Sequence, residues 1–174
     1  MQTDITYETP SQPRQLRLDT VTHCNAFCLS CHRFQTKRNG VMPLELLTKL
    51  LEDVRKWQKP LAEIVPVNYG EFLLYPDWGK VLSLITQLLP HTRLVLPTNG
   101  KLLTDEAVKT LAACPNLELI NFSVNAFFED TYKQFMGLPA TTIKQIERLI
   151  PLVKAWRKDI TIILPTQIIL LVLD

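Results

Sequence analysis

Three cysteines lie close together near the start of the chain, where residues 24–31 read Cys-Asn-Ala-Phe-Cys-Leu-Ser-Cys. Thiolates are the ligands of iron–sulfur clusters and of many zinc sites. A loop this short can wrap one metal centre without the entropic cost of closing a long loop. Cys24, Cys28 and Cys31 would leave one iron of a four-iron cluster without a protein ligand. An open position of that kind is what a catalytic metal centre needs.

The spacing alone leaves other interpretations open. His23 or His32 could complete a tetrahedral zinc site with the three thiols. The cysteines could also be small buried hydrophobes, although their concentration in a polar loop argues against this. Phe27 could shield a metal centre or anchor the loop in the core. Cys114 stands apart and is interpreted as a structural cysteine near a helix end.

The composition predicts one globular domain. The 174 residues are 47% hydrophobic and 21% charged, and 19 basic against 17 acidic residues give a net charge of +2. This near balance indicates no nucleic-acid or anionic-membrane surface. The polar start lacks a signal-peptide pattern, and residues 160–173 are too short and too interrupted for a membrane span. We expect a cytoplasmic protein, in keeping with the clustered cysteines.

The apolar periodicity alternates between short extended runs and longer helical runs. Strands are predicted at 15–19, 63–68, 93–96, 117–124 and 160–164, and helices at 43–60, 77–89, 104–114 and 142–157. Asp77 is expected to cap the second helix, Pro66 weakens a central position for the second strand, and Pro97 is expected to end the third. Alternation of this kind predicts an α/β fold with right-handed crossovers and a parallel sheet.

Residues 1–13 are predicted to be a flexible lead-in, and residues 14–174 the core domain. The apolar end of the chain, residues 165–174, has no clear helix after it and would leave a sheet edge uncovered. Either the domain is incomplete at its C-terminus, or a partner covers that edge.

The Cys-x3-Cys-x2-Cys loop after a first strand resembles the signature of the radical S-adenosylmethionine (radical SAM) superfamily. The resemblance extends over residues 16–137 and rests on segments in the family's order. These are the loop 68–71, Asn-Tyr-Gly-Glu, followed by 73–77; the strand end 97–100, Pro-Thr-Asn-Gly; the segment 121–125, Asn-Phe-Ser-Val-Asn; and 129–132 with Met136-Gly137. The resemblance implies a partial (β/α) TIM-type barrel, here with about five strands against six strand–helix units in the family.

The resemblance also implies the chemistry. The three cysteines would hold a [4Fe–4S] cluster that cleaves S-adenosylmethionine to a 5′-deoxyadenosyl radical, making the chain an oxidoreductase- or transferase-type enzyme. The substrate is unknown and could be a peptide, a cofactor precursor or another small molecule, and the electron donor would be a flavodoxin or ferredoxin. The alternatives are a non-catalytic zinc or iron–sulfur module and an inactive truncated radical SAM fragment.

Seven residues are the expected contacts to S-adenosylmethionine. Gly70 would allow close approach to the backbone, and Glu71 would receive the ammonium group in a charge-assisted hydrogen bond. Ser123 and Asn125 share one strand face and could reach the ribose or the carboxylate. Each of these residues could instead serve an ordinary turn or solvated surface. The full set is Ser30, Gly70, Glu71, Thr98, Asn99, Ser123 and Asn125.

Three positions depart from the family pattern. Ser30 stands where relatives often have an aromatic residue near the adenine, Tyr69 replaces the first glycine of the family's Gly-Gly-Glu stretch, and Phe72 replaces a common proline. The departure at Ser30 bears on adenine contact and leaves the cysteine ligands unaffected.

Overall fold

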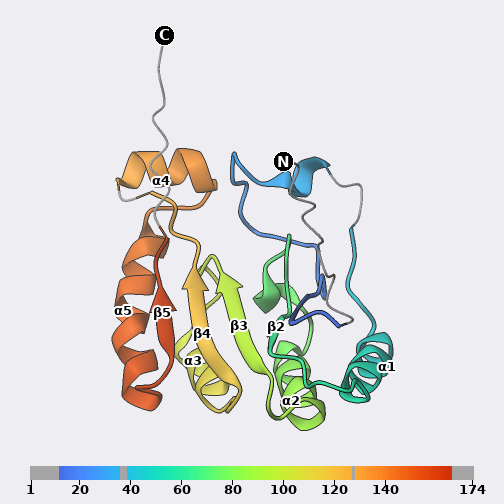
Figure 1. Cartoon of the computed structure of the whole chain (residues 1–174). Coiled ribbons are helices and arrows are strands. Elements are labelled where there is room, and N and C mark those ends of the chain that lie inside the picture. The colour runs from blue at the N-terminus through green and yellow to red at the C-terminus, as the bar shows by residue number, and fades with distance from the viewer. Residues whose placement is uncertain (1–11, 36–38, 127, 166–174) are drawn as a thin grey trace, which may run out of the picture.

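The structure is a computed structural model that describes residues 12–35, 39–126 and 128–165. Five strands alternate with helices along the chain (Figure 1). The strands are β1 (Gln15–Arg17), β2 (Glu63–Val65), β3 (Arg93–Thr98), β4 (Leu117–Phe122) and β5 (Thr161–Ile163). The α-helices are α1 (Leu44–Arg55), α2 (Trp78–Leu88), α3 (Asp105–Ala112), α4 (Glu129–Met136) and α5 (Thr141–Trp156), with short 3-10 helices η1 (His32–Gln35) and η2 (Phe72–Leu74).

All five strands are parallel and lie in one sheet in sequence order, β1-β2-β3-β4-β5. A parallel sheet in this order, with a helix between each pair of strands, is an open portion of a (β/α) barrel. The predicted α/β fold class is therefore confirmed. The predicted lead-in falls mostly on residues 1–11, and the apolar C-terminal stretch on residues 166–174; both lie outside the described residues.

Burial alternates along the central strand β3. Leu94, Leu96 and Thr98 are buried, whereas the alternate residues Arg93 and Val95 are half-buried. Fully buried Leu, Ile and Phe side chains fill the space between sheet and helices. Burial of such side chains is the dominant favourable contribution to folding.

Several predicted boundaries hold and one cap does not. The helix predicted to start at residue 104 is α3, and Thr104 is its N-cap, since its hydroxyl accepts a hydrogen bond from the Ala107 amide at 3.1 Å. Asp77 precedes α2 but adopts a left-handed conformation (φ 57°) and makes no cap hydrogen bond. Its carboxylate instead pairs with Lys80 at 2.8 Å. The prediction of a side-chain cap at Asp77 is therefore wrong.

Two prolines lie in or beside central strands, contrary to expectation. Pro97 is inside β3 rather than at its end. The amide of Arg93 points toward β2, whereas that of Leu94 points toward β4, so the missing N–H of Pro97 lies on the β2 side. The β2–β3 ladder has already ended there, at the pair Ile64–Leu94, so no hydrogen bond is lost. Pro66 follows directly after β2, which is central despite it.

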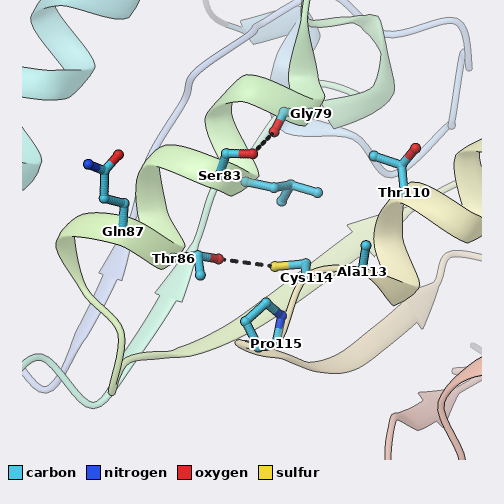
Figure 2. Close-up of a pocket in the computed structure, with 9 residues that line it drawn as sticks. Gly79, Ser83, Thr86, Gln87, Thr110, Ala113, Cys114 and Pro115 are labelled. Carbon is cyan, nitrogen blue, oxygen red and sulfur yellow. Dashed lines mark hydrogen bonds between the residues drawn. The ribbon is translucent and has the colours of Figure 1, made fainter.

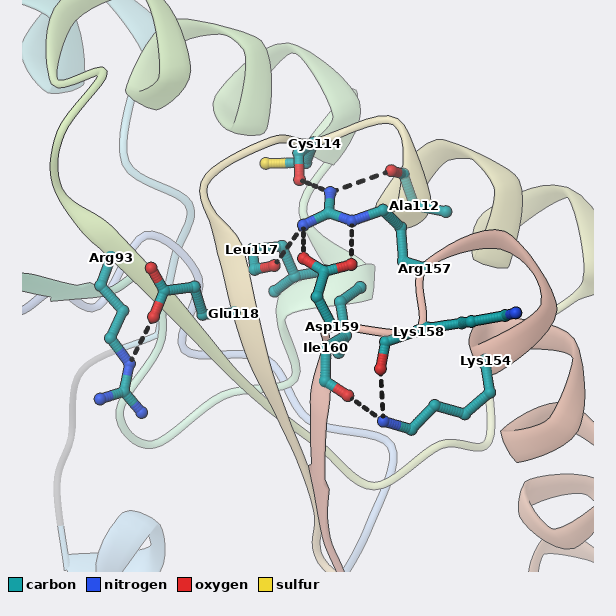
Figure 3. A network of polar contacts seen from close by, with 10 residues as sticks. All are labelled: Arg93, Ala112, Cys114, Leu117, Glu118, Lys154, Arg157, Lys158, Asp159 and Ile160. Carbon is teal, nitrogen blue, oxygen red and sulfur yellow. Dashed lines mark hydrogen bonds and ion pairs between the residues drawn. The ribbon is translucent and has the colours of Figure 1, made fainter.

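A polar network ties the amino ends of β4 and β5 to the preceding helices (Figure 3). The Arg157 guanidinium donates to the backbone carbonyls of Cys114 at 3.0 Å and Leu117 at 3.3 Å, and it pairs with Asp159 at 2.6 Å. This pairing lowers the pKa of the Asp159 carboxyl to about 2. The network lies at the end of the sheet opposite the cysteines. Within the described part of the chain, no helix is long and apolar enough to cross a membrane.

Candidate cofactor site

The carboxyl ends of the first four strands meet around a cavity of about 150 Å³. Parallel α/β sheets build their sites at this edge, because the loops after successive strands converge there. The loops after β1 and β2 and the ends of β3 and β4 each contribute side chains. The lining residues are Cys24, Ala26, Cys28, Cys31, Asn68, Tyr69, Gly70, Glu71, Pro97, Thr98, Asn99, Ser123 and Met136.

The cysteine loop is held against the end of α4. The backbone amides of Phe27 and Leu29 donate to the carbonyls of Met136 and Phe135, each at 2.9 Å. Gly137 ends the helix in a left-handed conformation (φ 62°), and a Cβ there would lie 2.8 Å from the Cβ of Phe27. A glycine is required at this position both for the backbone conformation and for the close packing of the loop.

The three thiols are free, half-buried and open to the same cavity. The Asn99 side-chain amide lies 3.8 Å from the Cys24 sulfur, and the Met136 sulfur lies 3.6 Å from the Cys28 sulfur. Burial raises the pKa of Cys24 and raises that of Cys28 to about 11, with a further contribution from neighbouring thiols at Cys28. Cys24 and Cys28 are therefore protonated at neutral pH until a metal centre replaces their protons.

This arrangement fits a multi-iron cluster. A four-iron cluster binds each thiolate through a different iron, so it requires thiols spread around one cavity. Cys24, Cys28 and Cys31 meet that requirement. His23 and His32, the alternative zinc ligands, are exposed and do not line the cavity.

The loop after β2 packs directly against the segment that leads into the cysteine loop. The Glu71 amide donates to the His23 carbonyl at 2.8 Å. A Cβ on Gly70 would lie 2.0 Å from the Val21 carbonyl oxygen, so only glycine fits. The Asp19 carboxylate accepts from the amides of Asn68 and Tyr69 at 3.1 and 3.0 Å, which orients the backbone of this loop.

Glu71 is buried in the cavity wall and ties this loop to the end of β3. Its carboxylate accepts hydrogen bonds from the Thr98 hydroxyl and the Asn99 amide, both at 2.8 Å, and from the Leu73 amide at 3.3 Å. Burial raises the pKa of Glu71, and these three donors partly offset the shift. Both oxygens already have protein partners, so the structure assigns Glu71 a positioning role, and the ammonium contact stays a prediction.

The other predicted contacts divide into two groups. Thr98, Asn99 and Ser123 line the cavity, as does Gly70. Asn125 does not line it; its backbone is left-handed (φ 51°), and its side-chain amide lies 3.2 Å from the Met136 sulfur, just behind the cavity wall. Ser30 is exposed and does not line the cavity in the described residues.

Phe27 and Cys114 are two residues for which the sequence left the structural role open. Phe27 is 62% exposed, so it does not anchor the loop in the core. Cys114 is buried in a separate groove between α2 and α3, with its sulfur 3.5 Å from the Thr86 hydroxyl (Figure 2). That groove belongs to the outer helical layer and contains none of the three clustered cysteines.

The fold and the cavity define a partial α/β barrel with a three-thiol site at the carboxyl edge of its sheet. Residues 19–168 match the family model of the radical SAM superfamily, and the chain belongs to that superfamily. The family uses a [4Fe–4S] cluster and S-adenosylmethionine, so the zinc alternative is not favoured.

Curated relatives carry several different activities. The chain is 26% identical over 140 residues to a probable GTP 3′,8-cyclase of Methanosarcina mazei, covering 76% of this chain and 39% of that protein. It is 30% identical over 135 residues to a GTP 3′,8-cyclase of Cyanothece sp., covering 76% and 40%. It is 28% identical over 129 residues to an AdoMet-dependent heme synthase of Methanosarcina barkeri, covering 73% and 35%. The chain thus spans 35–40% of the length of these relatives.

Solved structures support the fold. Native anSMEcpe with bound AdoMet matches with a TM-score of 0.66 at 20% identity, covering 85% of this chain and 42% of that one. BtrN in complex with AdoMet and 2-DOIA matches with a TM-score of 0.63 at 19% identity, covering 89% and 58%. At these identities the likeness establishes the architecture alone.

Proposed function

We propose that this chain is the cofactor-binding core of a radical SAM enzyme. In this proposal Cys24, Cys28 and Cys31 hold a [4Fe–4S] cluster, and the surrounding cavity holds S-adenosylmethionine. The observation that carries the proposal is the convergence of three free thiols and four strand ends on one cavity in a chain of this superfamily. When bound, the cluster and S-adenosylmethionine supply reductive cleavage of the sulfonium, which yields methionine and a 5′-deoxyadenosyl radical.

The protein's first task is to hold the thiols in place. The amides of Phe27 and Leu29 fasten the cysteine loop to α4, and the Glu71 amide fastens it to the loop after β2. The Asn99 side chain reaches both Cys24, at 3.8 Å, and the Asn25 side chain, at 2.7 Å. Hydrogen bonds to ligand sulfurs tune the potential of an iron–sulfur cluster, so Asn99 serves as a positioning and tuning residue.

The second task is to bind the polar ends of S-adenosylmethionine. Asn68, Tyr69 and Gly70 line the cavity, and the Asp19 carboxylate fixes the backbone of this loop through the amides of Asn68 and Tyr69, so backbone carbonyls of the loop are candidate acceptors for the ammonium group. Ser123 lines the cavity at the end of β4 and offers a hydroxyl to the ribose or carboxylate. Asn125 would reach the same groups from beside Met136.

The residues of this cavity serve the cofactors in this proposal, and they do not assign the substrate or the net reaction, whether oxidation or group transfer. The relatives are named as GTP cyclases and a heme synthase, and the match to SuiB includes a complex with its precursor peptide SuiA. A nucleotide, a cofactor precursor and a peptide are therefore the substrate classes to test, with a flavodoxin or ferredoxin as the reductant.

The test is anaerobic reconstitution with iron and sulfide, followed by reduction with dithionite in the presence of S-adenosylmethionine. We expect 5′-deoxyadenosine and methionine in equal amounts. Cys28→Ala should abolish both products, whereas the matched variant Cys114→Ala should retain them because Cys114 lies outside the cavity. Cluster-loaded wild-type chain that forms no 5′-deoxyadenosine would refute the proposed activity.

A further inference from the structure

Tyr69 is the one aromatic residue among the described residues that line the cofactor cavity. It is 37% exposed, and within the described chain its ring stacks on no other aromatic ring and its hydroxyl makes no hydrogen bond. The packing of the fold therefore gives no reason for an aromatic side chain here. Tyr69 stands where the family's Gly-Gly-Glu stretch has its first glycine, so the ring is a feature of this chain and not of the family pattern.

The backbone that carries the Tyr69 ring is fixed on two sides. The Asp19 carboxylate accepts a hydrogen bond from the Tyr69 amide at 3.0 Å. Two residues further on, the Glu71 amide donates at 2.8 Å to the carbonyl of His23, the residue before Cys24. These contacts hold the Cα of Tyr69 beside the Cys24 end of the cysteine loop, so only the side-chain torsions of Tyr69 remain free.

The charge of the cavity wall favours a cationic ligand. None of the described lining residues is a lysine, arginine or histidine, and the ones that can ionise are acidic. Arg33, in the neighbouring helix η1, donates to the Ala26 carbonyl at 3.1 Å and does not line the cavity. A cation in the cavity therefore meets acidic side chains and one aromatic ring. An aromatic face attracts a cation that lies within about 6 Å of the ring centre.

S-adenosylmethionine carries two cations, its ammonium group and its sulfonium. The ammonium has N–H donors, for which backbone carbonyls of the loop 68–70 are the candidate acceptors. The sulfonium has no proton to donate, so a hydrogen bond cannot hold it, whereas an aromatic face can. We infer that the Tyr69 ring packs against the sulfonium and makes the chain prefer S-adenosylmethionine over the neutral thioether S-adenosylhomocysteine. The inference rests on the proposed function.

The experiment measures the affinity of the anaerobically reconstituted chain for the two compounds by calorimetric titration. The cluster is left oxidised, so that S-adenosylmethionine is bound but not cleaved. S-adenosylhomocysteine lacks only the methyl group and the positive charge. The variants are Tyr69→Leu and Tyr69→Met, which remove the ring, and Tyr69→Phe, which keeps it. The matched control is Phe128→Leu, an aromatic residue of 79% exposure that does not line the cavity.

We expect Tyr69→Leu and Tyr69→Met to bind S-adenosylmethionine about fivefold more weakly than wild type, between the ranges for exposed and desolvated cation–π pairs. Their affinity for S-adenosylhomocysteine should stay within about twofold of wild type, because the thioether has no charge for the ring to attract. Tyr69→Phe and Phe128→Leu should match wild type with both compounds. Cluster content should be the same in all proteins.

Non-aromatic variants with the wild-type ratio of the two affinities would overturn the inference, because the ring would then act by its size or not at all. A Tyr69→Phe protein that loses as much affinity for S-adenosylmethionine as Tyr69→Leu would also overturn it, since the hydroxyl would then be the binding group. Wild-type chain that takes up no cluster, or that binds neither compound once loaded, would overturn the proposed function itself, which is a distinct result.

Discussion

Replacing Gly70 with alanine tests whether the loop after β2 must lie directly on the cysteine loop. The new Cβ would be 2.0 Å from the Val21 carbonyl oxygen and 2.9 Å from that of His23. Real Cβ atoms do not approach other atoms within 3.0 Å, so the two backbones must separate by about 1 Å at Val21. Neither neighbour is a flexible side chain that could move aside.

The cost follows from the contacts that separate. Overpacking of this kind costs about 1–3 kcal/mol, and loss of the Glu71–His23 backbone hydrogen bond, now 2.8 Å, adds about 1 kcal/mol. A loss of roughly 2–4 kcal/mol would lower the Tm of a chain of this size by about 5–15 °C. Displacement of binding groups by about 1 Å can reduce a binding-dependent rate up to about 100-fold, so affinity for S-adenosylmethionine should also fall.

The assay is thermal unfolding together with calorimetric titration of S-adenosylmethionine into the reconstituted protein. Gly40→Ala is the matched control, because a Cβ at Gly40 would have no neighbour within 4 Å. We expect Gly40→Ala to stay within about 0.5 kcal/mol of wild type. A Gly70→Ala protein with the Tm and the affinity of Gly40→Ala would refute the close approach described for this loop.

Three further substitutions probe the cavity wall and the far end of the sheet. Glu71→Gln should lower the free energy of unfolding in urea by about 1–3 kcal/mol, because the new side-chain amide either turns a donor toward the Asn99 backbone N–H or leaves a buried partner unpaired. Unchanged stability would contradict the buried hydrogen-bond network. Met136→Leu keeps the side-chain volume but removes the sulfur that lies 3.2 Å from the Asn125 side-chain amide. We expect several-fold weaker S-adenosylmethionine binding with unchanged cluster content. Equal affinity would show that Asn125 does not need the Met136 sulfur as a partner. The pKa of Asp159 falls from 3.8 to about 2 in the folded chain, so its contribution to the free energy of unfolding is present above pH 3.8 and is lost as pH falls toward 2. Apo Asp159→Asn should therefore lose less stability than the apo wild type between pH 5 and 2. Parallel plots of unfolding free energy against pH for the two proteins would exclude that contribution.

The sheet was predictable from the sequence because its signals are local. Short extended apolar runs mark the strands, and Thr104 marks the start of α3, where its hydroxyl accepts from the Ala107 amide. The true strand lengths were not predictable, since they depend on where a neighbouring strand ends. Pro97 illustrates this, because only the early end of β2 makes its missing N–H harmless.

The cavity was predictable in outline for the same reason, as every lining segment follows a strand. Sequence could not indicate Asp19, which orients the loop after β2 through hydrogen bonds to Asn68 and Tyr69, about 50 residues away in sequence. It named Met136 only within the segment that carries the family resemblance, and its contact with Cys28 depends on how α4 folds back over the loop. Aspartate and methionine are common residues in many roles, so their types carry no signal of such contacts.

The most direct test of the account is Mössbauer spectroscopy of chain reconstituted with iron-57. If Cys24, Cys28 and Cys31 hold three irons of a four-iron cluster, addition of S-adenosylmethionine should change the spectrum of one iron in four and leave the other three unchanged. Removal of any one of these cysteines should abolish that pattern, and Cys114→Ala should preserve it. A cluster of another size, or a four-iron spectrum that does not respond to S-adenosylmethionine, would contradict the central claim.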